Sequence, residues 1–360
     1  MEPTQSNLLI NNLGPQDEAA FSSLVDRCFK VPAGQHYLDD FPVWSEKFKP
    51  ASRQVLKMGA FDNGKLVAAA GAQITESKAN AFPMKIALIG AVSTDAEYRG
   101  RGIATQLVSL ATEWAQTQGA ALAVLWGSEH ELYRKIGFHP CGRQVRVAIS
   151  AMRSSRPLST IQTGWNPALF AKLKQRKEGL VIGDEDRGWI EAHKNVKWYW
   201  TGPADRPDAY AGIGRGIDLA DLVHEWGGET PALIELLAQL SEIHPRAQIL
   251  GSPETFSRVN FQYDPSAMEY LCLARVLDPL ATFRSYVPVS RATGFAADVE
   301  DHTLRIKIED RFGKDATGEL DIQDVSRFFF GPKEVGAPTL GKPWSNFFPL
   351  PLWFWGLDAV

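Results

Sequence analysis

A loop rich in glycine and arginine, Arg99 to Ala104, combines residue types that can bind a phosphate group. It lies between the strand-like stretch Ile86 to Ser93 and a run with the apolar spacing of a helix. Glycines let the backbone approach an anion closely, and the first amides of a helix are unpaired donors beside a partial positive charge. Arg99 and Arg101 add counter-charge at the rim. The loop therefore predicts a pyrophosphate site, and the alternative is a solvated turn between strand and helix.

The elements around this loop are predicted to alternate between α and β. Asp17 to Phe29 has the apolar spacing of one helix face, and the Asp-Asn-Gly turn at 62–64 is a strong hairpin signal between two strand-like stretches. The helix after the loop stops near Gly119, and Ala121 to Trp126 is typical of a buried strand. This order predicts an α/β domain in which one strand leads into the loop and a helix leads away from it.

The segment around the loop resembles the GNAT acetyltransferases. Their signature R/Q-x-x-G-x-G/A is matched by Arg99, Gly102 and Ala104, and Tyr133 begins a Tyr-x-x-x-Gly-Phe sequence that is similar to the family pattern. The resemblance implies acetyl-CoA as a co-substrate. It also implies that Tyr133 protonates the departing thiolate, because a phenol with a pKa near about 10 is protonated at neutral pH; a core aromatic is the alternative. The implied cofactor contacts are Val92, Ser93, Thr94, Arg99, Gly100, Arg101, Gly102, Ile103, Ala104, Thr105, Ser128 and Glu129.

The chain is also similar to the Eis (enhanced intracellular survival) family. The similarity rests on Leu-Trp-Gly-Ser-Glu at 125–129, with a tyrosine four residues after the glutamate. It implies an α/β fold with tandem GNAT (acyl-CoA N-acyltransferase) domains, followed by a small α+β sterol-carrier-like domain. We expect the catalytic domain at 1–150, a second, degenerate GNAT-like domain at 151–268, and the carrier-like domain with the tail at 269–360. The resemblance also suggests a homo-oligomer.

The base implied by this family resemblance is unusual, because it is a terminal carboxylate folded back into the active site. In this sequence that group is the carboxylate of Val360. The preceding tail, from Phe347 onward, is rich in aromatic residues and proline, so it could anchor a terminal charge. Plain packing of an apolar tail is the alternative.

Candidate contacts for the acceptor lie between the first predicted helix and the first hairpin, where GNAT substrates bind. They are Asp39, Asp40, Phe41 and Trp44. Carboxylates and aromatic rings suit a cationic amine, through charge pairing and cation–π contact. A solvated loop is the alternative.

A second glycine-rich run, Gly212 to Gly216, lies within a strand-like stretch and not before a helix, so its geometry does not fit anion binding. The equivalent of the cofactor loop in the middle segment is Gly227 to Thr230, which has no arginine and carries an acid. The second domain is therefore predicted to bind no cofactor.

Composition narrows the function classes. The chain has 360 residues and a net charge of −4, which argues against a nucleic-acid-binding protein. Its three cysteines lie far apart, and its seven histidines show no metal-ligand spacing, so we expect no metal and a reducing, cytoplasmic setting. No apolar stretch reaches the roughly 20 residues of a membrane span, so a soluble protein is expected.

The resulting hypothesis is an N-acetyltransferase. It would transfer an acetyl group from acetyl-CoA to a primary amine, either on a small cationic molecule or on a lysine side chain, by direct attack in a ternary complex. Two alternatives remain: a long-chain acyl-CoA N-acyltransferase, and a non-catalytic module that binds CoA or lipid.

Overall fold

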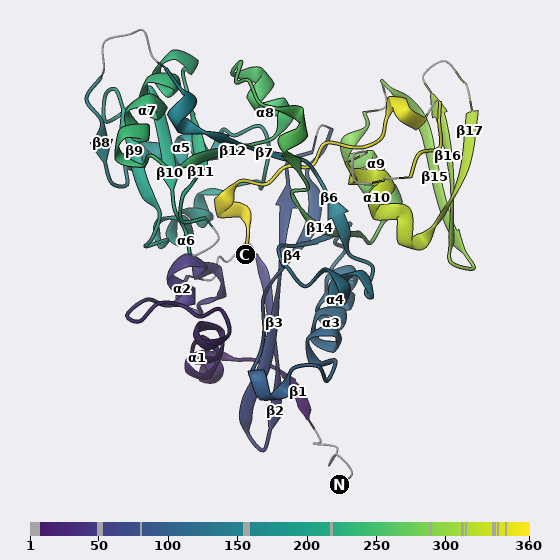
Figure 1. Cartoon of the computed structure of the whole chain (residues 1–360). Helices are drawn as coiled ribbons and strands as arrows, with labels where there is room; N and C mark the ends of the chain where they lie inside the picture. The colour runs from purple at the N-terminus through teal and green to yellow at the C-terminus, as the bar shows by residue number, and fades with distance from the viewer. Residues whose placement is uncertain are drawn as a thin grey trace.

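The computed structural model describes residues 8–48, 53–79, 81–153, 159–216, 219–288, 290–310, 313, 315–332, 336, 338–342 and 344–360. Within these residues the chain forms two seven-stranded sheets and one three-stranded sheet. Figure 1 shows the three-stranded sheet apart from the other two, and the yellow C-terminal tail runs back from it toward the middle of the molecule.

The first sheet carries the predicted loop. Its strands, in spatial order, are β1 (Leu9–Asn12), β2 (Gln54–Asp62), β3 (Lys65–Ser77), β4 (Met84–Thr94), β5 (Leu122–Leu125), β14 (Cys272–Val276) and β6 (His139–Cys141). Only β4 and β5 pair in parallel among these described strands. Helices α1 (Glu18–Cys28) and α2 (Tyr37–Asp40) lie on one side of the sheet, and α3 (Ile103–Thr117) and α4 (His130–Arg134) on the other (Figure 1). Because both faces are covered, β3 is buried along most of its length.

The local elements around the loop form as the sequence predicts. Asn63 and Gly64 have φ values of 49° and 81°, and this left-handed pair makes the tight turn between β2 and β3. Helix α3 buries an apolar face that includes Leu107, Val108 and Ala111 against the sheet. Helix α3 connects β4 to its parallel neighbour β5, so the loop before it opens at the ends of these two strands.

The second sheet has a related plan. Its order is β13 (Met268–Glu269), β7 (Gln144–Ala148), β12 (Gln248–Gly251), β11 (Leu222–Gly228), β10 (Ala209–Ile213), β9 (Lys197–Thr201) and β8 (Gln162–Thr163). Strands β11 and β12 are parallel and are joined through α7 (Thr230–Ile243), as β4 and β5 are through α3. The other helices of this part are α5 (Pro167–Lys174), α6 (Arg187–Glu191) and α8 (Pro253–Arg258). The run Gly212 to Gly216 begins inside β10, in agreement with its predicted place in a strand.

Two strands lie in a different sheet from the one that the order of the sequence predicts. Strand β7, expected to belong to the first domain, pairs with β12 and β13 of the second sheet. Strand β14, expected to begin the C-terminal domain, lies between β5 and β6 of the first sheet. A strand can satisfy its backbone hydrogen bonds at any free edge of a sheet. Its position in the sequence therefore does not determine which sheet it joins.

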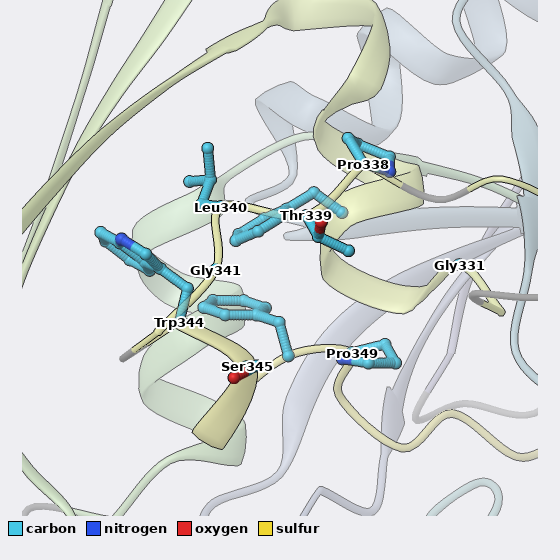
Figure 2. Close-up of a pocket in the computed structure, with 10 residues that line it drawn as sticks. Gly331, Pro338, Thr339, Leu340, Gly341, Trp344, Ser345 and Pro349 are labelled. Atoms are coloured by element: carbon cyan, nitrogen blue, oxygen red, sulfur yellow. The ribbon is translucent and has the colours of Figure 1, made fainter.

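The C-terminal part is a small α+β unit. It consists of the antiparallel strands β15 (Ala292–Glu300), β16 (Thr303–Asp310) and β17 (Asp315–Asp321), with helices α9 (Pro279–Tyr286) and α10 (Val325–Phe330). Leu304, Ile306 and Ile308 alternate along β16 and are buried toward the helices. Figure 2 shows a hollow in this unit, where the side chains of Leu340 and Trp344 flank a small space beside α10. No helix of the described residues is long and apolar enough to cross a membrane.

Candidate active site

The pairing of β4 with β5 ends before β4 does, and we call the region beyond the last pair the wedge. Their pairing runs from Ile86 opposite Leu122 to Ile89 opposite Leu125, where β5 ends, while β4 continues to Thr94. The residues of β4 that follow Ile89 therefore have no partner in β5. Two parallel strands that separate in this way leave backbone groups free to bind a ligand between them.

A β-bulge lies on β4 where the wedge begins. Gly71 of β3 pairs with Gly90, but the next pair is Ala69 with Ser93, so β4 carries one extra residue. Ala91 in the bulge has a φ of 53°, a left-handed conformation that is uncommon for alanine. Such a bulge turns backbone and side-chain groups out of the regular ladder, and bulges are frequent beside active sites. The side-chain oxygens of Ser93 and Thr94 are buried and have no hydrogen-bond partner among the described residues.

The glycine-rich loop is open at both predicted glycines. Gly100 and Gly102 have φ values of 75° and 76°, and a Cβ atom added at either would meet no atom within 4 Å. Gly102 is the N-cap of α3, and its carbonyl accepts a bond from the amide of Gln106. The amides of the first helical residues, 103–105, have no partner among the hydrogen bonds of the described residues. A helix start with free amides and open space in front of it fits a bound diphosphate.

The two arginines lie at the rim of this loop. Arg99 donates from Nε to the carbonyl of Thr94 at 3.1 Å, and Arg101 donates to the carbonyl of Glu97 at 2.8 Å. The Arg101 guanidinium also lies over the ring of Tyr98 at 4.9 Å. Both hydrogen bonds are exposed to solvent. Among the described residues, neither arginine forms an ion pair with a carboxylate. Their charge is therefore free to attract an anion.

Tyr133 lies on α4, close to the end of β5. A Cβ atom added at Gly127 would lie 2.7 Å from Cε2 of Tyr133 and 3.2 Å from its hydroxyl oxygen, so the phenol lies over the backbone that follows β5. Burial, with a smaller contribution from the charge of Glu129, raises the pKa of Tyr133 to about 12. The phenol is therefore a proton donor and not a base at neutral pH. Ser128 and Glu129 are exposed in the turn before α4.

The tail from the far end of the sequence reaches β4 at the bulge. A Cβ atom added at Gly90 would lie 2.5 Å from a backbone oxygen of Val360 and 2.6 Å from its carbonyl carbon. The same atom would lie 2.9 Å from Cζ2 of Trp44, so Val360 and the indole both lie on this glycine. The Val360 side chain packs in the cluster that contains Trp44 and Ala91. In Figure 1 the C-terminus likewise lies between α2 and β4.

The four candidate acceptor contacts lie near this point, but they are not a solvated loop. Trp44 is fully buried, fills the space over Gly71 and Gly90, and its indole nitrogen has no hydrogen-bond partner among the described residues. Asp40 is 4% exposed and accepts a hydrogen bond from Asn195. The remaining two candidates also have partners within the chain. Asp39 forms an ion pair with Lys194 at 2.7 Å, and the ring of Phe41 lies under the guanidinium of Arg215 at 4.4 Å.

Sequence reasoning missed the residues that shape the floor of the site. Gly71 and Gly90 admit the indole and the tail, and a glycine inside an otherwise apolar strand is a known sign of a close approach. The bulge at Ala91 had no signal of its own, since alanine does not favour a left-handed conformation. Among the described residues, no group of three or more His, Cys, Asp or Glu side chains could hold a metal ion. The hollow in Figure 2 shares no lining residue with this site.

Comparison with known proteins identifies a related domain and related folds. The family model of the acetyltransferase (GNAT) domain matches residues 10–141. The chain is similar to the structure of a GCN5-related N-acetyltransferase from Anabaena variabilis, with 14% identity and a TM-score of 0.65 over 98% of this chain and 100% of that one. It is also similar to a probable N-acyltransferase from Enterococcus faecalis, with 12% identity and a TM-score of 0.65 over 97% and 98% of the two chains. No curated protein sequence matches the chain significantly.

A third similar structure is Eis1 from Mycobacterium abscessus, with 16% identity and a TM-score of 0.61 over 98% of this chain and 97% of that one. At such identities the likeness is one of fold. The first segment is therefore a GNAT acetyltransferase domain, and the whole chain has the mixed α/β architecture of these larger proteins. The likeness of the C-terminal unit to a sterol carrier stays a prediction.

Proposed function

We propose that the chain is an acetyl-CoA-dependent N-acetyltransferase that acetylates a primary amine, on a small cationic molecule or on a lysine side chain. The observation that carries the proposal is the wedge beside the bulge at Ala91, with an open helix start at Gly102, inside a GNAT domain. The roles that we propose for Tyr133 and Val360 are supported by two close approaches, of the Tyr133 ring to Gly127 after β5 and of Val360 to Gly90 on β4.

The chain's own groups fit the co-substrate along the wedge. The amides of Ile103, Ala104 and Thr105, with Arg99 and Arg101 at the rim, would hold its diphosphate. Ser93 and Thr94 would bind its pantetheine arm, because each has a buried hydroxyl with no partner among the described residues. When bound, acetyl-CoA supplies an activated acyl group on a thiol leaving group. Backbone amides at the bulge, near Val92, would donate to the oxyanion that develops on the thioester carbonyl.

The proton acceptor that we propose is the carboxylate of Val360. An alkyl amine arrives protonated, since its pKa is near about 10.4. Transfer of its proton to the carboxylate, directly or through a water molecule, converts two charged groups into two neutral ones. The buried indole of Trp44 covers the carboxylate beside Gly90, and this burial favours the neutral pair. The Arg215 guanidinium, which donates to the carbonyl of the adjacent Ala359, opposes it by favouring the ionised carboxylate. The free amine is then ready to attack.

The proton donor that we propose is the hydroxyl of Tyr133. Because burial raises its pKa to about 12, it keeps its proton at neutral and mildly basic pH. It would donate a hydrogen bond to the departing sulfur and deliver its proton as the carbon–sulfur bond breaks. The second proton, which the nitrogen loses on becoming an amide, would return to the phenolate and restore the hydroxyl. Holding both reactants between Tyr133 and Val360 would also supply a large part of the rate enhancement.

The second unit is proposed to bind no cofactor. The loop that precedes α7 is closed, because a Cβ atom added at Gly228 would lie 2.1 Å from the carbonyl oxygen of Asp208. The amide of Glu229 also donates to that carbonyl, at 2.8 Å. The open space at Gly100 and Gly102 has no counterpart at Gly228, so one cofactor is expected per chain.

Release of free thiol from acetyl-CoA with a panel of amines, and mass detection of the acylated product, tests this function. We expect acylation of cationic primary amines with acetyl-CoA as the preferred donor. Faster reaction with a long-chain acyl-CoA would replace acetyl transfer by transfer of a longer acyl group. Binding of CoA without any product from the whole panel would favour a non-catalytic binding module.

A further inference from the structure

We propose that the second unit is a clamp that fixes the position of the Val360 carboxylate on β4, and that Arg176, Glu225 and Asp358 are its positioning residues. The proposal rests on the proposed function, because it assigns a role to the unit that carries no cofactor loop. It concerns the tail segment Trp355–Val360, which we call the terminal segment.

Backbone hydrogen bonds anchor the terminal segment to the second unit. The amide of Leu357 donates to Glu225 at 2.8 Å, and the carbonyl of Ala359 accepts from Arg215 at 2.9 Å. The indole nitrogen of Trp355 donates to the carbonyl of Glu178 at 3.2 Å. Side chains and backbone of the second unit therefore satisfy polar groups along the segment, and these directional bonds define its position.

A buried group of charges holds the same segment. The Arg176 guanidinium lies 2.5 Å from the Glu225 carboxylate and 3.0 Å from that of Asp358, and the side chains of all three are at most 3% exposed. The other oxygen of Asp358 accepts from the amides of Leu180 and Trp355. Burial raises the pKa of Glu225 to about 7, against the attraction of Arg176 and together with the charge of Asp358. Burying two carboxylates around one guanidinium is unfavourable compared with apolar packing, so the arrangement is better explained by positioning than by stability.

Close contacts fix the register of the terminal segment. A Cβ atom added at Gly356 would lie 2.1 Å from Nδ1 of His224, and one added at Gly179 would lie 2.3 Å from Oδ2 of Asp358. A shift of the segment by one residue would bring a side chain against His224, so the segment fits in one register only. Ala359 is the single residue between the Asp358 anchor and Val360. At about 3.5 Å per residue, the carboxylate has little freedom beyond its place at Gly90.

The test compares Asp358→Asn with Asp186→Asn in the full-length chain, after the mass of each protein has verified its C-terminal residue. Asp186 is a matched control, because it is 2% exposed, pairs with Arg53 at 2.9 Å and accepts from the amide of Gly183, but does not contact the terminal segment. Thermal unfolding reports the loss of a buried ion pair in either variant. Turnover, KM and calorimetric affinity for CoA report the site.

We expect Asp358→Asn to lower kcat by about 10- to 100-fold with little change in CoA affinity, and Asp186→Asn to keep kcat near that of the unmodified protein. In a chain that lacks Val360, the terminal carboxylate lies on Ala359, one residue back from Gly90. Asp358→Asn should then have almost no further effect, because the segment it positions no longer brings a carboxylate to Gly90. A purely structural role would lower turnover in both backgrounds. If Asp358→Asn does not fold, Gly356→Ala replaces it, since it leaves every charge in place and displaces the segment from His224.

Digestion with a carboxypeptidase of broad specificity gives a readout that needs no activity. The unmodified protein and Asp186→Asn should retain Ala359 and Val360, while Asp358→Asn loses them at least about tenfold faster. Equal digestion of the three proteins, or equal kcat for the two variants, would overturn the clamp. If the clamp is confirmed by digestion and removal of Val360 leaves turnover unchanged, the base assignment fails while the anchoring of the segment stands.

Discussion

Replacing Gly90 with alanine should displace the group that we propose as the base. The added methyl carbon would lie 2.5 Å from an oxygen of Val360, whereas such contacts are essentially never under 3.0 Å and are ordinary from 3.4 Å, so the two atoms must separate by 0.5–0.9 Å. A misplacement of about 1 Å at a reacting group can cost about 100-fold in rate. The neighbouring indole of Trp44 must also move, at a cost of about 1–3 kcal/mol of stability. We therefore expect kcat to fall by about 10- to 100-fold.

Gly71→Ala is the matched control for this change. Gly71 lies opposite Gly90 on β3, and its added Cβ would lie 2.4 Å from Cζ3 of Trp44, with no atom of Val360 among its nearest contacts. Both variants therefore crowd the same indole, but only Gly90→Ala crowds the tail. Steady-state thiol release at saturating acetyl-CoA, with thermal unfolding and CoA calorimetry on the same samples, separates the two effects. Equal turnover of the two variants would refute the place that we give to the carboxylate.

Three further outcomes are expected. Tyr133→Phe should lower kcat by about 100-fold or more and leave the calorimetric affinity for CoA nearly intact; preserved turnover would mean that the proton donor is elsewhere. Arg101→Gln should weaken CoA binding and reduce its dependence on salt, with circular dichroism unchanged. Because the pKa of Tyr133 is raised to about 12, kcat should not fall between about pH 8 and pH 10. A decline there, centred near the usual value of about 10, would contradict the burial of this phenol.

The elements around the proposed cofactor loop form as the sequence predicted because their signals are local. The turn at Asn63 and Gly64, the glycines at 100 and 102, and the apolar face of α3 all depend on residues within a few positions of one another. Local sterics and helix periodicity are strong enough there to determine the structure.

The acceptor side was less predictable because its contacts are far apart in sequence. Gly90 is a plain glycine in an apolar strand, and the groups that approach it are Trp44 and Val360, from opposite ends of the chain. The sheet that β7 and β14 join depends on which edges are free after the rest of each sheet has formed. Neither fact has a local signature, so neither could be read from spacing.

The two large units divide the proposed chemistry between them. Both contain a parallel strand pair joined through a helix, but the loop before α3 is open and the loop before α7 is filled by the backbone at Asp208. The second unit has a related fold, and we propose that its buried charges bind the tail, whereas the first unit binds the cofactor. Residues 10–141 alone match the acetyltransferase domain, yet they contain neither β14, which lies between β5 and β6, nor the carboxylate at Gly90. We therefore expect the complete site to form only when the second and third units hold the tail against β4.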